Sequence, residues 1–328
     1  MRPNFHPRLI NPRFGDPGLF VELLHRREAL LFDLGDLSRL PARDLLRVTH
    51  VFVTHAHIDH FIGFDALLRA LVGREKRVAM VGPRGFAERV EHKLLSYEWD
   101  LVERYESDLV FDVIELHDGG ERQAARFRFK RAFAREPLDV DEAEAGVVAA
   151  CDGFTVRARI LEHHGPSVGY AVREPTHVNI WRNRLEARGL ATGPWLQALK
   201  QAVLEGAADD QPIRLPDGCT EPLGRLRDLL SVTAGQTIAY VTDVADTPRN
   251  RSDIAELVKD ADTLFIESRF SAQDGEQAQQ RAHLTTTAAG EIARRAGVRR
   301  VEPFHFSPRY ETLGEQPMIA EVLAAFQG

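Results

Sequence analysis

Cysteine is scarce in this sequence, with only Cys151 and Cys219 among 328 residues. Two cysteines are too few for a disulfide framework, and they lack the short spacing of a cysteine-based zinc site. We therefore expect both to be ordinary buried or half-buried thiols. Long apolar runs are missing too: none approaches the roughly 18 residues of a membrane-spanning helix, and residues 1–7 lack the apolar core of a signal peptide. These absences predict a cytoplasmic protein with no membrane partner.

Basic charge is not in excess either. The chain carries 42 Lys and Arg against 49 Asp and Glu, a formal net charge of -7. This balance argues against a surface that is coated by nucleic acid over its whole extent, although it allows a local basic face. With 44% hydrophobic residues the chain can bury a sizeable core, as one large domain or two ordinary ones.

Histidine, by contrast, is concentrated in one stretch, Thr54–His60, which follows an apolar run at residues 51–53 and precedes a helical pattern that begins near Ile62. In an extended or turning segment, His55 and His57 can face one way while Asp59 and His60 face another, an arrangement that suits two metal ions better than one. Imidazole and carboxylate are zinc ligands, and a catalytic site keeps a position open for water. The alternative is an exposed, pH-sensitive cluster on a loop; the pattern favours a metal site.

The motif His-x-His-x-Asp-His at the end of an apolar strand resembles the signature of the metallo-β-lactamase superfamily. The resemblance implies an α/β fold, an αββα sandwich of residues 1–328 as a single domain, with a metal site along one edge. Asp33-x-Gly35 resembles the Asp-x-Gly of this superfamily, in which the Asp supports the metal-binding loop; a plain turn is the alternative.

Two further stretches have a clear periodicity. Apolar residues from Phe64 to Val72 recur at helical spacing, which predicts a helix that packs on a sheet, followed by a strand at 78–83 and a helix at 85–95. Residues 101–160 read as strands, and near 122–135 arginines alternate partly with phenylalanines. That basic face is either a contact to an RNA backbone or the solvated outer face of an added hairpin.

Several later apolar runs end in a ligand-type or proton-transfer side chain. They lead into His163-His164, Asp243, Glu267 and His305, and sites in layered α/β folds collect at such strand ends. Chemistry alone leaves open which of the paired histidines binds. His283 precedes a run of threonines that suits the start of a helix, where a phosphate would be tolerated nearby.

The composition shifts between 174 and 218, where two helical stretches, at 179–188 and from Trp195 to about Leu204, surround a Gly193-Pro194 turn before Leu215-Pro-Asp-Gly218. A chain that leaves a sheet in this way and returns behaves like an excursion from the core. Excursions of this length are usually functional or mobile.

Over residues 48–312 the sequence resembles the ribonuclease Z family, the tRNA 3′-processing endonucleases. The resemblance is carried by the following residues: His163 six positions before Gly169-Tyr170, the Gly193-Pro194 arm, Tyr240-Val-Thr-Asp243, Glu267, His283-Leu-Thr-Thr and His305-Phe-Ser-Pro-Arg-Tyr310.

This resemblance implies a role for each matching position. His55, His57 and His163 would hold one zinc, and Asp59, His60 and His305 a second, with Asp243 as the bridge. Asp59 would also orient the attacking water, while His283, oriented by Glu267, would donate a proton to the leaving 3′ oxygen. The arm at 176–218 would grip tRNA from one subunit of a homodimer, and the substrate contacts are expected from Thr285, Ser307, Arg309, Gly193 and Pro194.

The expected function is that of a dinuclear zinc phosphodiesterase, a ribonuclease Z-like endoribonuclease that cuts tRNA precursors to leave a 3′ hydroxyl and a 5′ phosphate. The ligand set also accepts manganese or iron. Three departures bear on the substrate: the family's opening motif is replaced by residues 10–17, Ile266 stands where the family usually has His, and the segment 118–150 is enlarged. The alternatives are a hydrolase of a small phosphodiester or other ester, and an RNA-binding protein with a silent site.

Overall fold

The structure is a computed structural model that describes residues 4–24, 26–140 and 144–328. It separates into two compact units, one formed by Met1–Arg173 with Gln236–Gly328 and the other by Glu174–Gly235. The predicted arm at 176–218 lies inside the second unit, which extends further toward the C-terminus than the arm.

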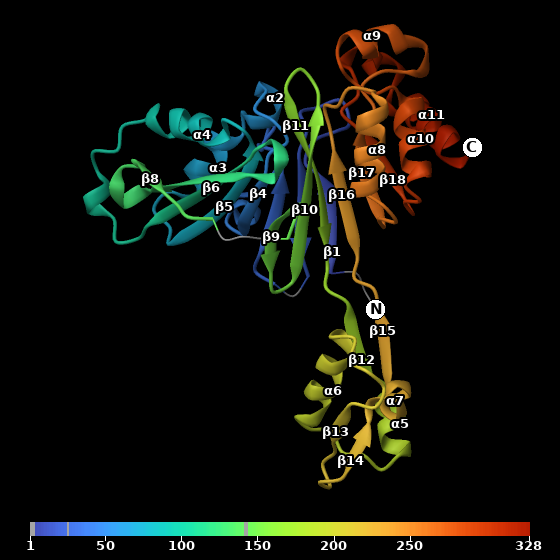
Figure 1. Ribbon diagram of the computed structural model, residues 1–328. Coiled ribbons are helices and arrows are strands. Elements are labelled where there is room, and N and C mark those ends of the chain that lie inside the picture. The colour runs from blue at the N-terminus through green and yellow to red at the C-terminus, as the bar shows by residue number, and fades with distance from the viewer. Residues whose placement is uncertain (1–3, 25, 141–143) are drawn as a thin grey trace. The chain divides into compact units, whose positions relative to one another are not determined.

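Two mixed sheets form the centre of the first unit (Figure 1). The eight-stranded sheet has the order β1 (Phe5–Leu9), β2 (Leu19–Leu23), β3 (Ala29–Phe32), β4 (Val48–Phe52), β5 (Lys76–Pro83), β6 (Leu109–Leu116), β7 (Arg122–Arg128), β8 (Arg135–Pro137). The six-stranded sheet has the order β18 (Val301–Phe304), β17 (Thr263–Glu267), β16 (Thr237–Val241), β11 (Pro166–Arg173), β10 (Phe154–Glu162), β9 (Val147–Cys151).

Alternating side chains explain why the sheets stack. Successive residues of a strand point to opposite faces, and in β3 Leu30 and Phe32 enter the core between the sheets while Leu31 enters the core beneath the helices. In β16, Tyr240 faces the core between the sheets, and Val241 points to the other side of its sheet, toward the helices that cover it. Both faces of each sheet are therefore apolar, which requires a covering layer on the outer sides.

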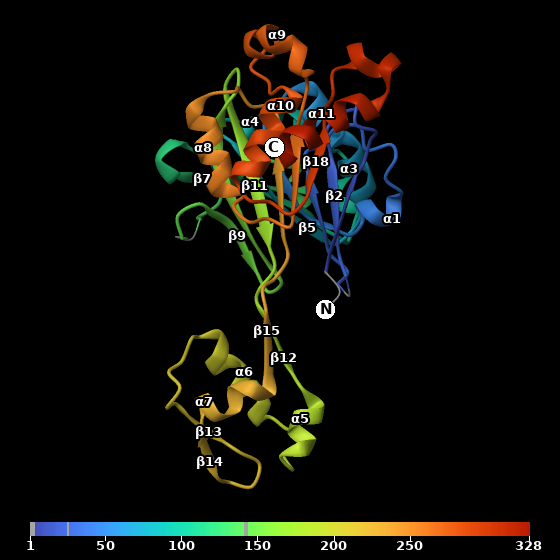
Figure 2. The same ribbon diagram turned by 90° about the vertical axis from the view of Figure 1, so that its right-hand side faces the viewer.

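Helices provide those outer layers. On the first sheet they are α1 (Ala42–Leu45), α2 (Ile58–Phe61), α3 (Phe64–Leu71) and α4 (Phe86–Leu95); on the second, α8 (Pro248–Leu257), α10 (Thr286–Arg295) and α11 (Glu315–Gln327). Figure 2 shows α8, α10 and α11 in front of the sheet that contains β11 and β18. The short α9 (Gly275–Gln280) precedes α10. The predicted αββα sandwich is thus confirmed.

Parallel pairing places the ends of several strands at one edge. Strands β3 to β6 are parallel neighbours, as are β16, β17 and β18. The carboxyl ends of β16, β17 and β18 lead into Asp243, Glu267 and His305, which therefore meet at the same edge of their sheet. The His motif follows β4 in the other sheet.

Three local expectations need correction or refinement. The first helix after the motif begins at Ile58, inside the motif, because His57 already has an extended N-cap conformation and Asp59 and His60 form a helical turn. The stretch predicted as helical at 179–188 is helical only as α5 (Arg182–Ala187), since residues 177–180 form β12 (His177–Ile180). The expectation of buried thiols was wrong: both cysteines are exposed, Cys151 at the end of an edge strand.

Two arginines of β7 pair with carboxylates in β6 and in the residue before it. The arginines at 126 and 128 form ion pairs of 2.7 Å each with Asp112 and Asp108. Arginines that already pair with carboxylates are less available to the phosphates of RNA. For this strand the ion pairs therefore favour the solvated outer face of a hairpin over an RNA contact.

The second unit has a core of its own. Strand β12 pairs with β15 (Leu230–Thr233), and β13 (Pro212–Arg214) pairs with β14 (Thr220–Pro222). Three helices pack with them, α5, α6 (Trp195–Leu204) and α7 (Leu223–Leu226), and their buried residues include Leu185, Trp195 and Leu223. Across the described residues of both units, no helix combines the length and the apolar character that crossing a membrane requires.

Candidate metal centre

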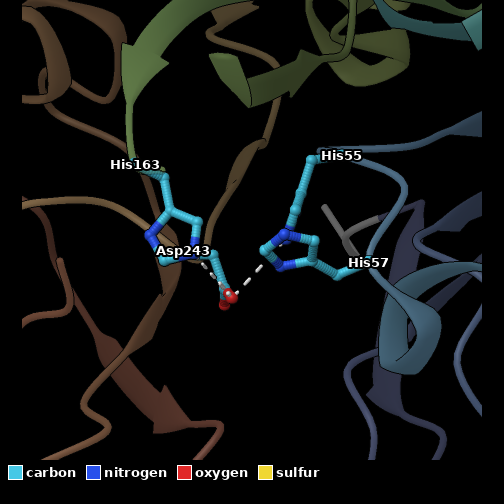
Figure 3. A group of neighbouring side chains, drawn as sticks. All are labelled: His55, His57, His163 and Asp243. Atoms are coloured by element: carbon cyan, nitrogen blue, oxygen red, sulfur yellow. Dashed lines mark ion pairs between the residues drawn. The ribbon is translucent and has the colours of Figure 1, made fainter. Parts of the chain in front are cut away.

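Side chains from distant segments converge into clusters of ligand-type atoms at the edge of the first unit. One cluster contains His55, His57, His163 and Asp243, with potential ligand atoms within 4.8 Å of one another (Figure 3). A second contains Asp59, His60 and His305, and a third shares Asp243 with Glu267 and His283. Every predicted ligand therefore belongs to one of the first two clusters, and the predicted proton donor and its partner form the third.

Asp243 lies at the centre of these clusters. Its Oδ2 is 3.6 Å from His55 Nε2, 3.5 Å from His60 Nε2 and 3.7 Å from His163 Nε2. Its Oδ1 is 3.1 Å from His305 Nε2. One carboxylate thus faces imidazoles of both predicted ligand groups, which is the geometry that a bridging ligand requires.

Asp33 supports the His motif from behind. It is fully buried with a positive φ of 58°, and its carboxylate accepts hydrogen bonds from Thr54 N at 2.7 Å and from the Tyr240 hydroxyl at 3.0 Å. Its Oδ2 lies 2.9 Å from His60 Nδ1. A ring nitrogen that donates to a carboxylate leaves the other nitrogen free for a metal, so Asp33 directs His60 Nε2 toward Asp243.

Of the two adjacent histidines after β10, only His163 belongs to a cluster. Its Nδ1 donates to the carbonyl oxygen of Ala282 at 2.8 Å, and this bond directs Nε2 toward Asp243. His164 lines the nearby pocket and belongs to none of the three clusters. The geometry favours His163 as the ligand, as the family resemblance implied.

The backbone conformation is also unusual at the sheet edge that carries these side chains. Asp243 and His305 have positive φ values of 51° and 58°, like Asp33. Non-glycine residues in this region cost of order 1–3 kcal/mol and cluster at functional sites. Here they allow the chain to turn sharply as it leaves β16 and β18, so that the side chains point to the common centre.

Burial and charge together shape protonation in the clusters. Burial lowers the pKa of His55 to about 2, so this imidazole is neutral near pH 7. Burial opposes the charged form of His60, but the carboxylates of Asp243 and Asp33 raise its pKa well above the usual value. Burial would raise the pKa of Asp243, yet His60 and His305 hold it well below its usual range. The centre therefore holds an ionised carboxylate among imidazoles.

These residues fit a metal. Among the described residues, only four buried side-chain nitrogen or oxygen atoms have no hydrogen-bond partner, and the Nε2 atoms of His55 and His60 are two of them. A buried polar atom without a partner costs about 1–3 kcal/mol. One divalent cation in each of the first two clusters would satisfy these nitrogens, and the cation at His60 would replace its proton.

His283 and Glu267 form a buried pair beside the first cluster. His283 Nδ1 lies 3.0 Å from Glu267 Oε2, and the other carboxylate oxygen accepts from Val244 N at 2.8 Å. Burial lowers the pKa of His283, but Glu267 outweighs it, and the net pKa is raised. The imidazole faces a pocket of about 230 Å³ lined by the following residues: His57, Asp59, His163, His164, Asp243, Arg269, Arg281 and His283.

The predicted substrate contacts lie outside this lining. The Thr285 hydroxyl accepts from Ala288 N at 3.1 Å and caps α10, and Arg309 packs on the ring of Phe270 with 5.3 Å from its guanidinium carbon to the centroid. Ser307 is nearly buried and its amide donates to the Arg269 carbonyl. Gly193 and Pro194 belong to the second unit, Pro194 as the N-cap of α6. Their contact with substrate stays a prediction.

Sequence reasoning missed two arginines of the pocket, Arg269 and Arg281. Arg269 comes two residues after Glu267, so a cation directly behind a strand-end carboxylate was the available signal. Arg281 lies two residues before His283, at the end of α9. Nothing in the neighbouring sequence distinguishes it from an ordinary surface arginine.

Comparison with known proteins agrees with this fold and geometry. The family described as "Beta-lactamase superfamily domain" matches residues 9–180 and 227–306. Human tRNase Z, short form, covers 94% of this chain, and 92% of its own chain is matched, at a TM-score of 0.52 and 17% identity. The metallo-beta-lactamase fold protein YhfI from Bacillus subtilis covers 98% of this chain and is matched over 92% of its own, at a TM-score of 0.55 and 15% identity. The protein thus has the metallo-β-lactamase fold.

Curated relatives narrow the class to a family. Ribonuclease Z of Deinococcus radiodurans is 30% identical over 90% of this chain and 88% of its own length. Ribonuclease Z of Thermobifida fusca is 33% identical over 91% of this chain and 81% of its own length. The chain belongs to the ribonuclease Z family, which confirms the resemblance seen in the sequence.

Proposed function

We propose that this protein is a metal-dependent endoribonuclease of ribonuclease Z type, which hydrolyses a phosphodiester bond at the 3′ ends of tRNA precursors. The observation that carries this proposal is the convergence of two groups of ligand-type side chains on Asp243, next to a buried His283–Glu267 pair. The relatives named Ribonuclease Z, aligned over most of the chain, supply the substrate class.

The first ligand group is His55, His57 and His163, the second is Asp59, His60 and His305, and Asp243 faces both. The proposed cofactor is a pair of zinc ions, with manganese or iron as alternatives that suit the same donors. Bound cations would supply Lewis acidity toward the phosphate oxygens and would lower the pKa of a water nucleophile.

The remaining chemistry belongs to the chain itself. Asp59, partly exposed at the pocket, accepts a hydrogen bond from the attacking water and orients it. His283 is held by Glu267 through Nδ1, which leaves Nε2 to face the pocket and to donate a proton to the leaving 3′ oxygen. A general acid needs its proton at the working pH, and the raised pKa of His283 serves that role.

The proposed setting is the cytoplasm, and the proposed assembly is a homodimer. In that assembly the second unit, including the predicted arm at 176–218 with Gly193 and Pro194, binds the body of the tRNA away from the scissile bond. Arg182 and Arg184 are exposed on α5 and offer positive charge to a phosphate backbone, although Arg182 also pairs with Glu186 at 3.3 Å.

Parallel assays test the function. Zinc-loaded protein is incubated with a tRNA precursor that carries a 3′ trailer and, separately, with a chromogenic phosphodiester; the Asp243→Ala variant shows whether any cleavage arises from this centre. We expect cleavage of both substrates, with a 3′ hydroxyl on the tRNA and a 5′ phosphate on the trailer. Hydrolysis of the small ester alone would contradict the tRNA assignment, and activity on neither substrate with metal bound would indicate a silent RNA-binding protein.

A further inference from the structure

Arg269 lies at the metal centre although it belongs to none of the ligand clusters. It follows the end of β17 by two residues, and its carbonyl oxygen accepts a hydrogen bond from Ser307 N at 2.9 Å. This backbone bond joins the segments that follow β17 and β18. It holds Arg269 beside His305, and the side chain lines the same pocket as Asp59 and His283.

The guanidinium of Arg269 points at an imidazole. Its Nη1 lies 2.7 Å from Nε2 and 3.2 Å from Nδ1 of His305. Within the described residues Arg269 forms no ion pair with a carboxylate, whereas Arg251, for example, pairs with both Asp246 and Glu291. The pocket thus contains a permanent positive charge that no carboxylate in the described parts of the chain pairs with.

The contact with His305 also uses the nitrogen that faces Asp243. If His305 Nε2 held a cation, its lone pair would no longer be available to Arg269. The guanidinium would lose this acceptor and keep its five donors and its charge. The Ser307 N–Arg269 O bond would still hold its backbone beside the pocket, where the side chain would need an anion.

We propose that Arg269 is a phosphate-binding residue of the active site. It donates to a non-bridging oxygen of the phosphodiester and, after cleavage, to the 5′ phosphate of the product. Arginine suits this task because its planar guanidinium binds phosphate through two parallel hydrogen bonds. The inference rests on the proposed phosphodiester chemistry, and it names a specific residue that binds the reacting group in addition to the metal ligands.

Phosphate binding without RNA provides the test. The affinities of zinc-loaded full-length protein for inorganic phosphate and for AMP are measured by calorimetry, together with its zinc content and the KM for a chromogenic phosphodiester. We expect Arg269→Ala to bind both anions about 10- to 100-fold more weakly and to raise KM, with unchanged zinc content. Arg269→Lys should recover part of the loss, because it restores the charge without the two-pronged geometry.

Arg300→Ala is the matched control, since Arg300 lies at the opposite end of β18 from His305 and pairs with Glu302. It removes the same charge and should bind phosphate like the wild type. Unchanged anion affinity in Arg269→Ala would overturn the proposal. A loss of affinity that parallels a loss of zinc would overturn it as well, because Arg269 would then support the metals. Neither result depends on tRNA cleavage, which tests the proposed function separately.

Discussion

Single side chains at the centre are oriented through the atom that faces away from it. His60 is held through Nδ1 by Asp33, His163 by the carbonyl of Ala282, and His283 by Glu267. Each bond holds the ring with Nδ1 facing outward and Nε2 facing the centre. Such outer partners commonly change metal affinity or activity 10- to 100-fold when they are removed. The arrangement therefore depends on residues that would never touch a metal or a substrate.

His283→Ala separates proton donation from metal binding. We expect kcat on a tRNA precursor to fall about 10²- to 10⁴-fold, the range for loss of a general acid, while zinc content stays that of the wild type. Metal analysis of the purified variant and single-turnover cleavage give the two readouts. His92→Ala, on the exposed face of α4, is the matched control. Loss of zinc from His283→Ala would show that His283 is a ligand and not the donor.

Glu267→Gln tests the electrostatic part of the pair. The Glu267 carboxylate raises the pKa of His283, so a donor that must be protonated keeps its proton to higher pH and kcat falls only as pH rises through this pKa. Removal of the negative charge lowers the pKa, and the alkaline limb of the kcat profile should move to lower pH. His283→Ala should show no such limb. An alkaline limb at the same pH in Glu267→Gln and the wild type would rule out the coupling.

How well individual residues could be foreseen depended on their chemistry. Histidines and acids at strand ends are rare enough to be conspicuous, so the residues of all three clusters were named in advance. Arg269 and Arg281 belong to a residue type that covers much of the surface, and only the three-dimensional structure shows that they line the pocket. The choice between His163 and His164 likewise needed the Ala282 carbonyl, which is more than 100 positions away.

At the scale of elements, the turn that carries Asp33 and the short helix α2 are joined through their backbones. Leu34 N donates to His60 O at 2.9 Å, and Gly63 N donates to Leu34 O at 2.8 Å. The two segments approach so closely that a Cβ atom at Gly63 would overlap the Gly35 carbonyl oxygen and lie 2.6 Å from Leu37 Cγ. The glycine thus permits the contact that brings Asp33 to His60.

Gly63→Ala should therefore damage the metal centre from a distance. We expect a loss of about 1–3 kcal/mol in unfolding free energy, as for other overpacked sites, and a lower affinity for zinc because His60 loses its alignment with Asp33. Chemical denaturation and competition with a metal chelator measure the two effects. Gly275→Ala is the control, since a Cβ there meets nothing within 4 Å. Wild-type zinc affinity in Gly63→Ala would refute the proposed link.

Elements with a regular pattern were predicted better than short ones. Helix α3 buries Phe64, Leu67, Leu68 and Leu71, the stripe that the sequence displays. Helix α2 has only four residues, too few for any periodicity, and it begins inside the motif, for which the sequence predicts an extended or turning segment. The predicted helix at 179–188 includes the last two residues of strand β12, because β15, the partner of β12, lies about 50 residues away and pairing over such a distance leaves no local signal.

At the scale of the whole molecule, the sandwich carries the ligand clusters and the second unit has a core of its own. The excursion begins and ends at neighbouring strands of one sheet: Arg173 of β11 stands opposite Thr237 of β16 in an antiparallel pair. A chain that can close there with a short turn does not need the second unit to complete its sheet. The second unit is therefore available for a task other than stability, such as the proposed grip on tRNA.

Deletion of residues 174–236, with Arg173 joined to Thr237 by Asn-Gly, tests this division. An Asn-Gly turn suits two antiparallel strands, so the sandwich should fold, retain its zinc and hydrolyse a chromogenic phosphodiester within about threefold of the wild-type rate. Cleavage of a tRNA precursor should fall at least about 100-fold in kcat/KM, because a second point of attachment raises the effective concentration of the scissile bond at the centre. Thermal unfolding and zinc content verify folding of the shortened chain. If the folded, zinc-bound deletion variant cleaves the precursor as fast as the intact protein, substrate binding resides in the sandwich and the second unit has another role.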